Sequence, residues 1–93
     1  MPSLQPIRFN LGRVVLTPGA ENHLPEDEIH MALTKHQTCD WTGESLEYRE
    51  ANELALAQGK AIFSACRTNN GIRFFIATED NRKQTTVFLE GYK

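Results

Sequence analysis

The chain has 93 residues, of which 40% are hydrophobic and 24% are charged, and its formal net charge is −2. A chain of this length forms one domain that buries about 60% of its unfolded-chain surface, which leaves little room for a deep enclosed cavity. The composition is globular and argues against disorder. No apolar run approaches the roughly 20 residues that a membrane-spanning helix needs, so we expect a cytoplasmic protein without a membrane segment.

The N-terminal part predicts a loose start followed by a short strand. Residues 1–6 contain two prolines and no signal-peptide core, so we expect them to form a flexible arm of the single domain that spans residues 1–93. Residues 13–17, with three apolar residues at their centre, predict a short strand. Pro18 followed by Gly19 is typical of positions i+1 and i+2 of a type II turn, which would end that strand.

Two helices are predicted in the middle of the chain. The first begins at Pro25 and ends near His36, with acidic residues in its first turn and an apolar face at the spacing i, i+3, i+4, i+7. The second begins after Ser45, a good N-cap, and ends before Gly59, a good C-terminal stop. Its expected buried stripe consists of Tyr48, Ala51, Leu54 and Ala55.

Asn52 lies on or near that buried stripe of the second helix. Asparagine is a poor helix former, so a mid-helix position favours a specific hydrogen bond. We expect a buried amide that bonds to the loop of residues 36–44, with a contact to a ligand as the alternative.

The C-terminal third predicts three strands joined by two turns, over residues 60–67, 72–78 and 85–89. Asn70 followed by Gly71 is typical of a type I′ hairpin, in which both central residues have a positive φ. The expected fold class is therefore α+β: a three-stranded C-terminal antiparallel β-meander plus a short N-terminal strand, packed by two α-helices on one face. The other face would be partly exposed and available to a partner.

Charge is distributed unevenly along the chain. Residues 20–58 hold nine acidic and two basic side chains, whereas residues 59–93 hold six basic and three acidic ones. Such asymmetry indicates a charged partner but does not specify a fold.

The sequence gives little support for a catalytic site or a metal site. His30, His36, Cys39 and Asp40 do not complete the recurrent ligand spacing of a zinc site, so we expect no metal and no cofactor. A Cys39–His36 nucleophile pair would also need an orienting third group and an oxyanion hole, which nothing in the sequence predicts. We therefore expect no catalytic residues and a protein that is not an enzyme.

Two surfaces are candidates for binding. One combines Asp40 and Trp41 with the acidic edge of the second helix; its residues are Asp40, Trp41, Glu44, Glu47, Glu50 and Glu53. This surface could imitate a row of phosphates, or it could be a solvated helix face with Trp41 as a lid on the core. The other is the mildly basic sheet with Phe74 and Phe75, which invites comparison with platforms for single-stranded nucleic acid. Because the chain is acidic overall and has no RNP-like motif, we do not expect direct nucleic-acid binding.

The sequence also resembles a family of small proteins from bacterial plasmids and prophages, often labelled plasmid-related proteins and sometimes restriction-enzyme subunits. The matching positions are residues 11–20, His36, Asp40, Trp41, residues 52–56, Gly59, residues 76–79, Arg82, residues 85–89 and Tyr92. The resemblance covers nearly the whole chain and implies a shared fold and a mobile genetic element as the setting. It implies no catalytic residues.

These expectations lead to one hypothesis and one alternative. The hypothesis is a non-enzymatic phage or plasmid protein that binds a host protein, a component of a nucleic-acid-targeting defence complex, and inhibits it as anti-CRISPR or anti-restriction proteins do. The acidic surface would occupy the basic channel of that partner. The alternative is a small nucleic-acid-binding regulator that uses the basic β-sheet.

Overall fold

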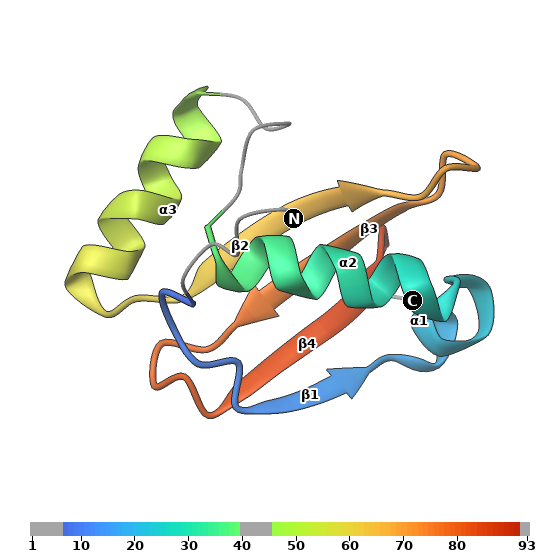
Figure 1. Cartoon of the computed structure of the whole chain (residues 1–93), viewed down its shortest axis with the longest axis horizontal. Helices are drawn as coiled ribbons and strands as arrows, with labels where there is room; N and C mark the ends of the chain where they lie inside the picture. Colours follow the sequence, from blue (N-terminus) through green and yellow to red (C-terminus); the bar gives the residue numbers. More distant parts are fainter. Residues whose placement is uncertain (1–6, 40–45, 92–93) are drawn as a thin grey trace, which may run out of the picture.

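The computed structural model describes residues 7–39 and 46–91, which form a layer of helices over a four-stranded sheet (Figure 1). The elements, in chain order, are β1 (Arg13–Leu16), α1 (Pro18–His23), α2 (Glu26–Gln37), α3 (Leu46–Gln58), β2 (Ile62–Arg67), β3 (Arg73–Thr78) and β4 (Gln84–Leu89). The predicted α+β class is confirmed, as are the C-terminal meander and the short N-terminal strand.

The sheet has the strand order β1-β4-β3-β2 and is mixed. The strands β2, β3 and β4 pair antiparallel, whereas β1 pairs parallel with β4, from Arg13 opposite Gln84 to Leu16 opposite Val87. The sequence left the position of this N-terminal strand open. Gly12 allows the backbone before β1 to lie close to Lys83 of the β3–β4 turn. Its φ is +67°, and a Cβ at this position would lie 2.3 Å from the carbonyl oxygen of Lys83. Only glycine allows the chain to enter β1 this close to the β3–β4 turn.

The predicted type II turn at Pro18-Gly19 is wrong, because these residues open the short helix α1. Thr17 is its N-cap, and the Thr17 hydroxyl accepts a hydrogen bond from the Ala20 backbone N–H at 3.3 Å. Proline suits the first helical position because its missing N–H would have no intrahelical partner there. The Thr-Pro pair was therefore a helix-start signal.

The β2–β3 hairpin is confirmed, but its turn type is not type I′. The Gly71 N–H bonds to the Thr68 carbonyl and the Thr68 N–H bonds to the Ile72 carbonyl, each at 2.9 Å. Gly71 has a φ of +88°, whereas Asn70 is not among the described non-glycine residues with positive φ. The loop is one residue longer than a type I′ hairpin, so a single left-handed residue suffices.

The main core lies between the sheet and the helices α1 and α2. Its buried side chains are Ala20, Leu24, Ile29, Phe74, Ile76 and Val87. The predicted stripe of the first helix is confirmed, since Ile29 and His36 are buried and Ala32 and Leu33 are half-buried. The helix itself begins one residue later than predicted, with Pro25 as its N-cap.

Helix α3 lies beside the edge strand β2 rather than across the sheet (Figure 1). A smaller cluster attaches it, in which Ala55 and Leu56 pack against Phe9 and Ile62. The predicted stop is confirmed: Gly59 has a φ of +67°, and the Lys60 N–H bonds to the Ala55 carbonyl at 2.8 Å, a Schellman motif. The predicted N-cap, Ser45, lies outside the described residues.

The predicted buried stripe of α3 is partly wrong. Tyr48 and Ala55 are half-buried as expected, but Ala51 is exposed and Leu54 is 57% exposed. Asn52 and Leu56 take their places on the inner side. Among the described residues, the helix packs against the edge strand β2, the N-terminal segment and Cys39, so its buried face is narrow. Within the described part of the chain, no helix is long and apolar enough to cross a bilayer.

Candidate functional site

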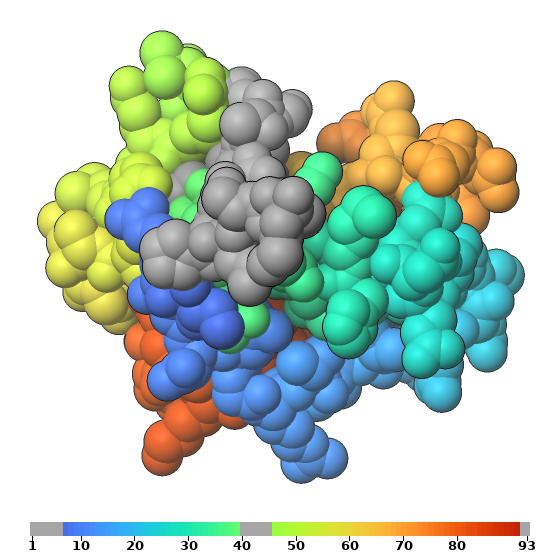
Figure 2. Space-filling model, viewed as in Figure 1, coloured from blue at the N-terminus to red at the C-terminus, as the bar shows by residue number. Residues whose placement is uncertain are grey.

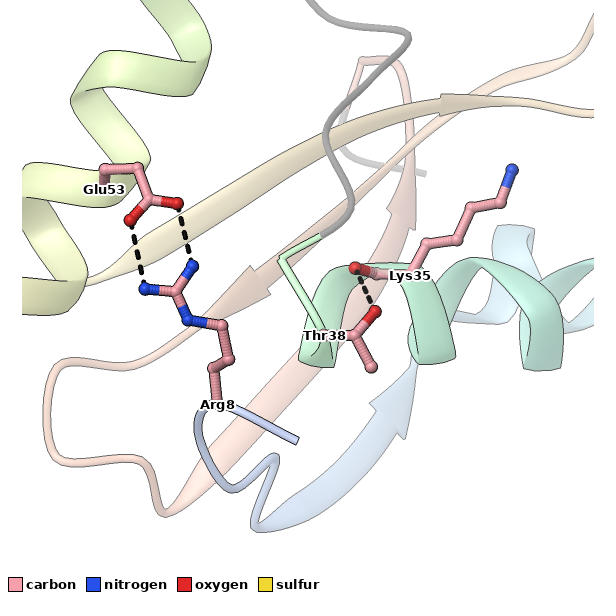
Figure 3. Close-up of polar contacts among 4 residues, drawn as sticks. All are labelled: Arg8, Lys35, Thr38 and Glu53. Atoms are coloured by element: carbon pink, nitrogen blue, oxygen red, sulfur yellow. Dashed lines mark hydrogen bonds and ion pairs between the residues drawn. The ribbon is translucent and has the colours of Figure 1, made fainter. Parts of the chain in front are cut away.

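The predicted acidic surface is only partly present among the described residues. Glu47 and Glu50 are exposed on α3, but Glu53 is engaged by Arg8 of the N-terminal segment (Figure 3). The two guanidinium N–H groups of Arg8 donate to the two carboxylate oxygens of Glu53, at 3.0 and 3.2 Å. This pairing raises the pKa of Arg8 above its ordinary value. Glu53 therefore links α3 to the N-terminal segment, and its charge is paired within the chain although its side chain is 49% exposed.

The other acidic groups that the structure describes do not continue this surface. Asp40, Trp41 and Glu44 lie outside the described residues. Glu21 and Glu26 belong to α1 and the start of α2, which lie at the end of the molecule opposite α3 (Figures 1 and 2). The described acidic side chains of residues 20–58 are therefore divided between the two ends of the molecule, because α2 runs along the sheet and separates α1 from α3 (Figure 1).

The outward side of α3 nevertheless has a distinct character. Asn52 points to the sheet and is 4% exposed, so residues about half a turn away point outward. These include Glu47, Glu50 and Leu54, and Leu46 is also 61% exposed. We call Leu46, Glu47, Glu50 and Leu54 the α3 outer face. It presents two large apolar side chains beside two carboxylates.

Asn52 makes a specific contact with the edge of the sheet. Its Nδ2 donates to the Phe63 carbonyl at 2.5 Å, and its Oδ1 accepts from the Phe63 backbone N–H at 3.2 Å. The expectation of a buried amide is confirmed, and the partner among the described residues is strand β2. Residues 40–44 of the predicted loop lie outside those residues. The amide replaces the strand that would otherwise pair with this edge residue, which protects β2 from strand addition at that point.

A buried chain of hydrogen bonds joins α2 to the sheet through His36, which is 1% exposed. The ring Nδ1 lies 2.5 Å from Ser64 Oγ, and the ring Nε2 lies 2.8 Å from Thr78 Oγ1. Thr78 Oγ1 lies 2.8 Å from Thr85 Oγ1, which donates to the Leu11 carbonyl at 2.7 Å. We call these four side chains the histidine network. It connects α2, three strands and the N-terminal segment.

The carbonyl at the end of the histidine network fixes the direction of its hydrogen bonds as far as His36 Nε2. A carbonyl only accepts, so Thr85 donates to Leu11 and must accept from Thr78. Thr78 then accepts from the His36 Nε2–H. Burial, and to a smaller extent the charge of Arg82, lowers the pKa of His36 to about 4. The ring is therefore neutral at pH 7, and its Nδ1 accepts from Ser64.

The described residues do not assemble the catalytic or metal groups that were considered from the sequence. Both ring nitrogens of His36 bond to hydroxyl groups, so His36 is not placed to act as a base for Cys39. Burial raises the pKa of the Cys39 thiol, which lowers its reactivity. In residues 7–39 and 46–91, no group of three His, Cys, Asp or Glu side chains could hold a metal ion.

Sequence reasoning missed the partners of His36. Ser64, Thr78 and Thr85 each follow the alternation of their strands and point to the covered face, where apolar residues were expected. The available signal was that His36 itself lies on an apolar helix face. A buried imidazole needs partners, and these strands supply hydroxyl groups.

Comparison with protein-family models, with curated proteins and with solved structures finds no match. Several residues that carry the resemblance to plasmid and prophage proteins have structural roles: His36 and Thr85 belong to the histidine network, and Asn52 bonds to β2. The guanidinium of Arg82 donates to the Lys60 carbonyl at 2.7 Å. His36, Asn52, Arg82 and Thr85 are thus matching positions whose side chains hold this fold together.

Proposed function

We propose that this chain is a non-enzymatic binding protein of a plasmid or phage that inhibits a host nucleic-acid-targeting defence complex by docking the α3 outer face on it. The partner would be a protein, and no cofactor would take part. The resemblance to plasmid and prophage proteins supports the setting. The α3 outer face supports the mode of binding, in place of the larger acidic surface expected from the sequence.

The observation that carries this proposal is the exposure of Leu46 and Leu54, at 61% and 57%, beside Glu47 and Glu50 on the outward side of α3. Leu54 is on the side of the helix away from Asn52, so the fold itself does not use it. A helix that presents apolar and acidic groups together is suited to an apolar groove with a basic rim. The channel of a nucleic-acid-binding protein supplies such a rim.

The test is inhibition of nucleic-acid cleavage by purified CRISPR effectors and restriction enzymes of the host, measured against rising protein concentration. We expect inhibition that weakens as salt rises. Leu54→Ala, and separately Glu47→Lys with Glu50→Lys, should each raise the half-inhibitory concentration about tenfold or more.

A matched control carries the same change of charge at the opposite end of the molecule, as Glu21→Lys with Glu26→Lys. Circular dichroism would first establish that each variant is folded. The control should inhibit as the unaltered chain does. If neither α3 variant changes the half-inhibitory concentration, or if the control raises it as much as they do, the α3 outer face is not the inhibitory surface.

A further inference from the structure

The sheet face opposite α1 and α2 carries aromatic and basic side chains, although the chain as a whole is acidic. Strand pairing places Phe63, Phe75 and Phe88 on this face, because Ala65 lies opposite Phe75, Phe75 lies opposite Phe88, and Phe63 follows the same alternation as Ala65. No described helix covers them, since α1 and α2 pack against the alternate residues. We call this surface the open face.

Aromatic rings are arranged across the open face at different exposures. Phe75 and Phe88 stack on each other, with centroids 5.7 Å apart and ring planes at 28°. The guanidinium of Arg73 lies over the Phe75 ring, 6.0 Å from its centroid. Phe63 on the edge strand is 45% exposed. The stacked pair forms a rigid base, and Phe63 offers a ring to a ligand.

The charge of the open face has a single sign along its strands. Arg13 of β1, Arg67 of β2 and Arg73 of β3 share this face by the strand registers, and none of the four strands contains a carboxylate. Glu90, just after β4, pairs with Arg73 at 3.3 Å. Within the described residues, Arg13 and Arg67 have no ion-pair partner. The acidic residues that the structure describes lie outside the four strands.

Two of these arginines face each other across the hairpin. Arg67 lies directly opposite Arg73 in the β2–β3 register. Directly opposed side chains in a sheet have Cβ atoms about 4.5–5.5 Å apart, and like charges there are destabilising. Glu90 offsets part of this repulsion from one side. An anion between the two guanidinium groups would offset the rest, and phosphate suits their planar donor geometry.

We propose that the open face binds single-stranded nucleic acid. Its bases would stack on Phe63 and beside the Phe75–Phe88 pair, and its phosphates would contact Arg67 and Arg73. Stacking aromatics combined with cationic groups are the two requirements of a single-strand platform, because every base has a π-face and every nucleotide has a phosphate. Duplex DNA hides its base faces and could use only the arginines. This surface is separate from the α3 outer face, so it does not depend on the function proposed above.

The experiment is fluorescence anisotropy of labelled 12-mers of dT and of rU, with a 12-base-pair duplex and heparin as further arms. We expect the single strands to bind more tightly than the duplex at equal salt, and heparin to compete. The dT and rU arms show whether DNA or RNA is preferred. Absence of single-strand binding at low salt, or equal binding of duplex, would overturn the proposal.

Variants locate the site. Phe63→Ala should weaken single-strand binding about tenfold, within the range measured for loss of one stacked base. Arg67→Gln should weaken it and lower the slope of log affinity against log salt by about 0.7, the value for one phosphate contact on a single strand. The matched control is Arg49→Gln on α3, an exposed arginine that is not part of the sheet, which should change neither.

Both substituted side chains on the open face are accessible, so the folded state should persist, and thermal unfolding of each variant confirms this. A loss of affinity in Arg49→Gln equal to that in Arg67→Gln would show a general charge effect and overturn the assignment. Unchanged affinity of the folded Phe63→Ala variant would overturn the proposal that a base stacks on Phe63.

Discussion

The covered face and the open face of the sheet are built from alternate residues of the same strands, yet they differ in how completely the fold uses them. On the covered face, apolar side chains meet α1 and α2, and every polar side chain of the histidine network bonds to another group of the protein. On the open face, aromatic rings stack on one another beside arginines, and Arg67 opposes Arg73. The side chains of the covered face are packed and hydrogen-bonded within the protein, whereas the open face presents aromatic rings and arginines to which a ligand could bind.

In a domain of this size, binding is expected on exposed surfaces rather than in the interior. A chain this short has little interior to use for chemistry, and its buried polar residues fix the packing of α2 on the sheet. The open face and the α3 outer face are the two surfaces on which exposed apolar and charged side chains lie together. They lie on different elements and have opposite charge.

The largest expected difference between the two faces comes from neighbouring phenylalanines. Phe74 is 2% exposed on the covered face, whereas Phe75 is half-buried on the open face. Phe74→Ala should lower the free energy of unfolding by about 3–5 kcal/mol, because it leaves a cavity in the core. Phe75→Ala should cost about 1–2 kcal/mol, mainly the lost stacking on Phe88. Urea unfolding of both variants measures this; equal losses would mean that the open face is packed as tightly as the core.

The second prediction concerns pH and the histidine network. The pKa of His36 is about 4 in the folded chain and about 6.5 when it is exposed. Between these values the unfolded chain binds more protons, so stability must fall as pH falls from 6.5 toward 4, and above 6.5 the contribution is complete. The full loss is about 3 kcal/mol. Urea unfolding at pH 7 and at pH 4.5 measures most of it.

The control for this prediction is a histidine outside the network. His36→Gln should flatten the dependence of stability on pH, whereas His30→Gln, an exposed position on the same helix, should keep it. A folded chain whose stability is level between pH 7 and 4.5 would contradict the neutral buried ring.

The smallest expected effect lies at the edge strand where the two faces meet. Asn52→Ala removes both hydrogen bonds to Phe63 and leaves its backbone groups without this partner. We expect a loss of about 2 kcal/mol in the free energy of unfolding. Amide exchange at Phe63 should also speed up, because α3 no longer shields that N–H. Gln58→Ala, exposed on the same helix, should change neither quantity; equal effects in the two variants would show that the loss does not come from the hydrogen bonds between Asn52 and Phe63.

Much of the architecture was legible in the sequence because it depends on local rules. Alternating apolar residues marked β2 and β3, the spacing of Ile29 and His36 marked the inner face of α2, and Gly59 marked the end of α3. Pro18-Gly19 was wrongly predicted to form a turn, because proline suits both the second position of a turn and the first position of a helix. The candidate site was less predictable. Leu54 has the right spacing for a core residue, and only the position of α3 beside β2 leaves it exposed.

What the sequence determined by itself is the set of elements and the face that each presents, since periodicity, caps and turn residues act over a few neighbouring positions. The tertiary structure alone decided which side chains meet. It brought Arg8 to Glu53, joined His36 to hydroxyl groups on three strands, and separated acidic groups that are close in the chain. It also gathered arginines and phenylalanines on one face of an acidic protein. Contacts between residues distant in sequence depend on strand order and helix placement, which no local pattern specifies.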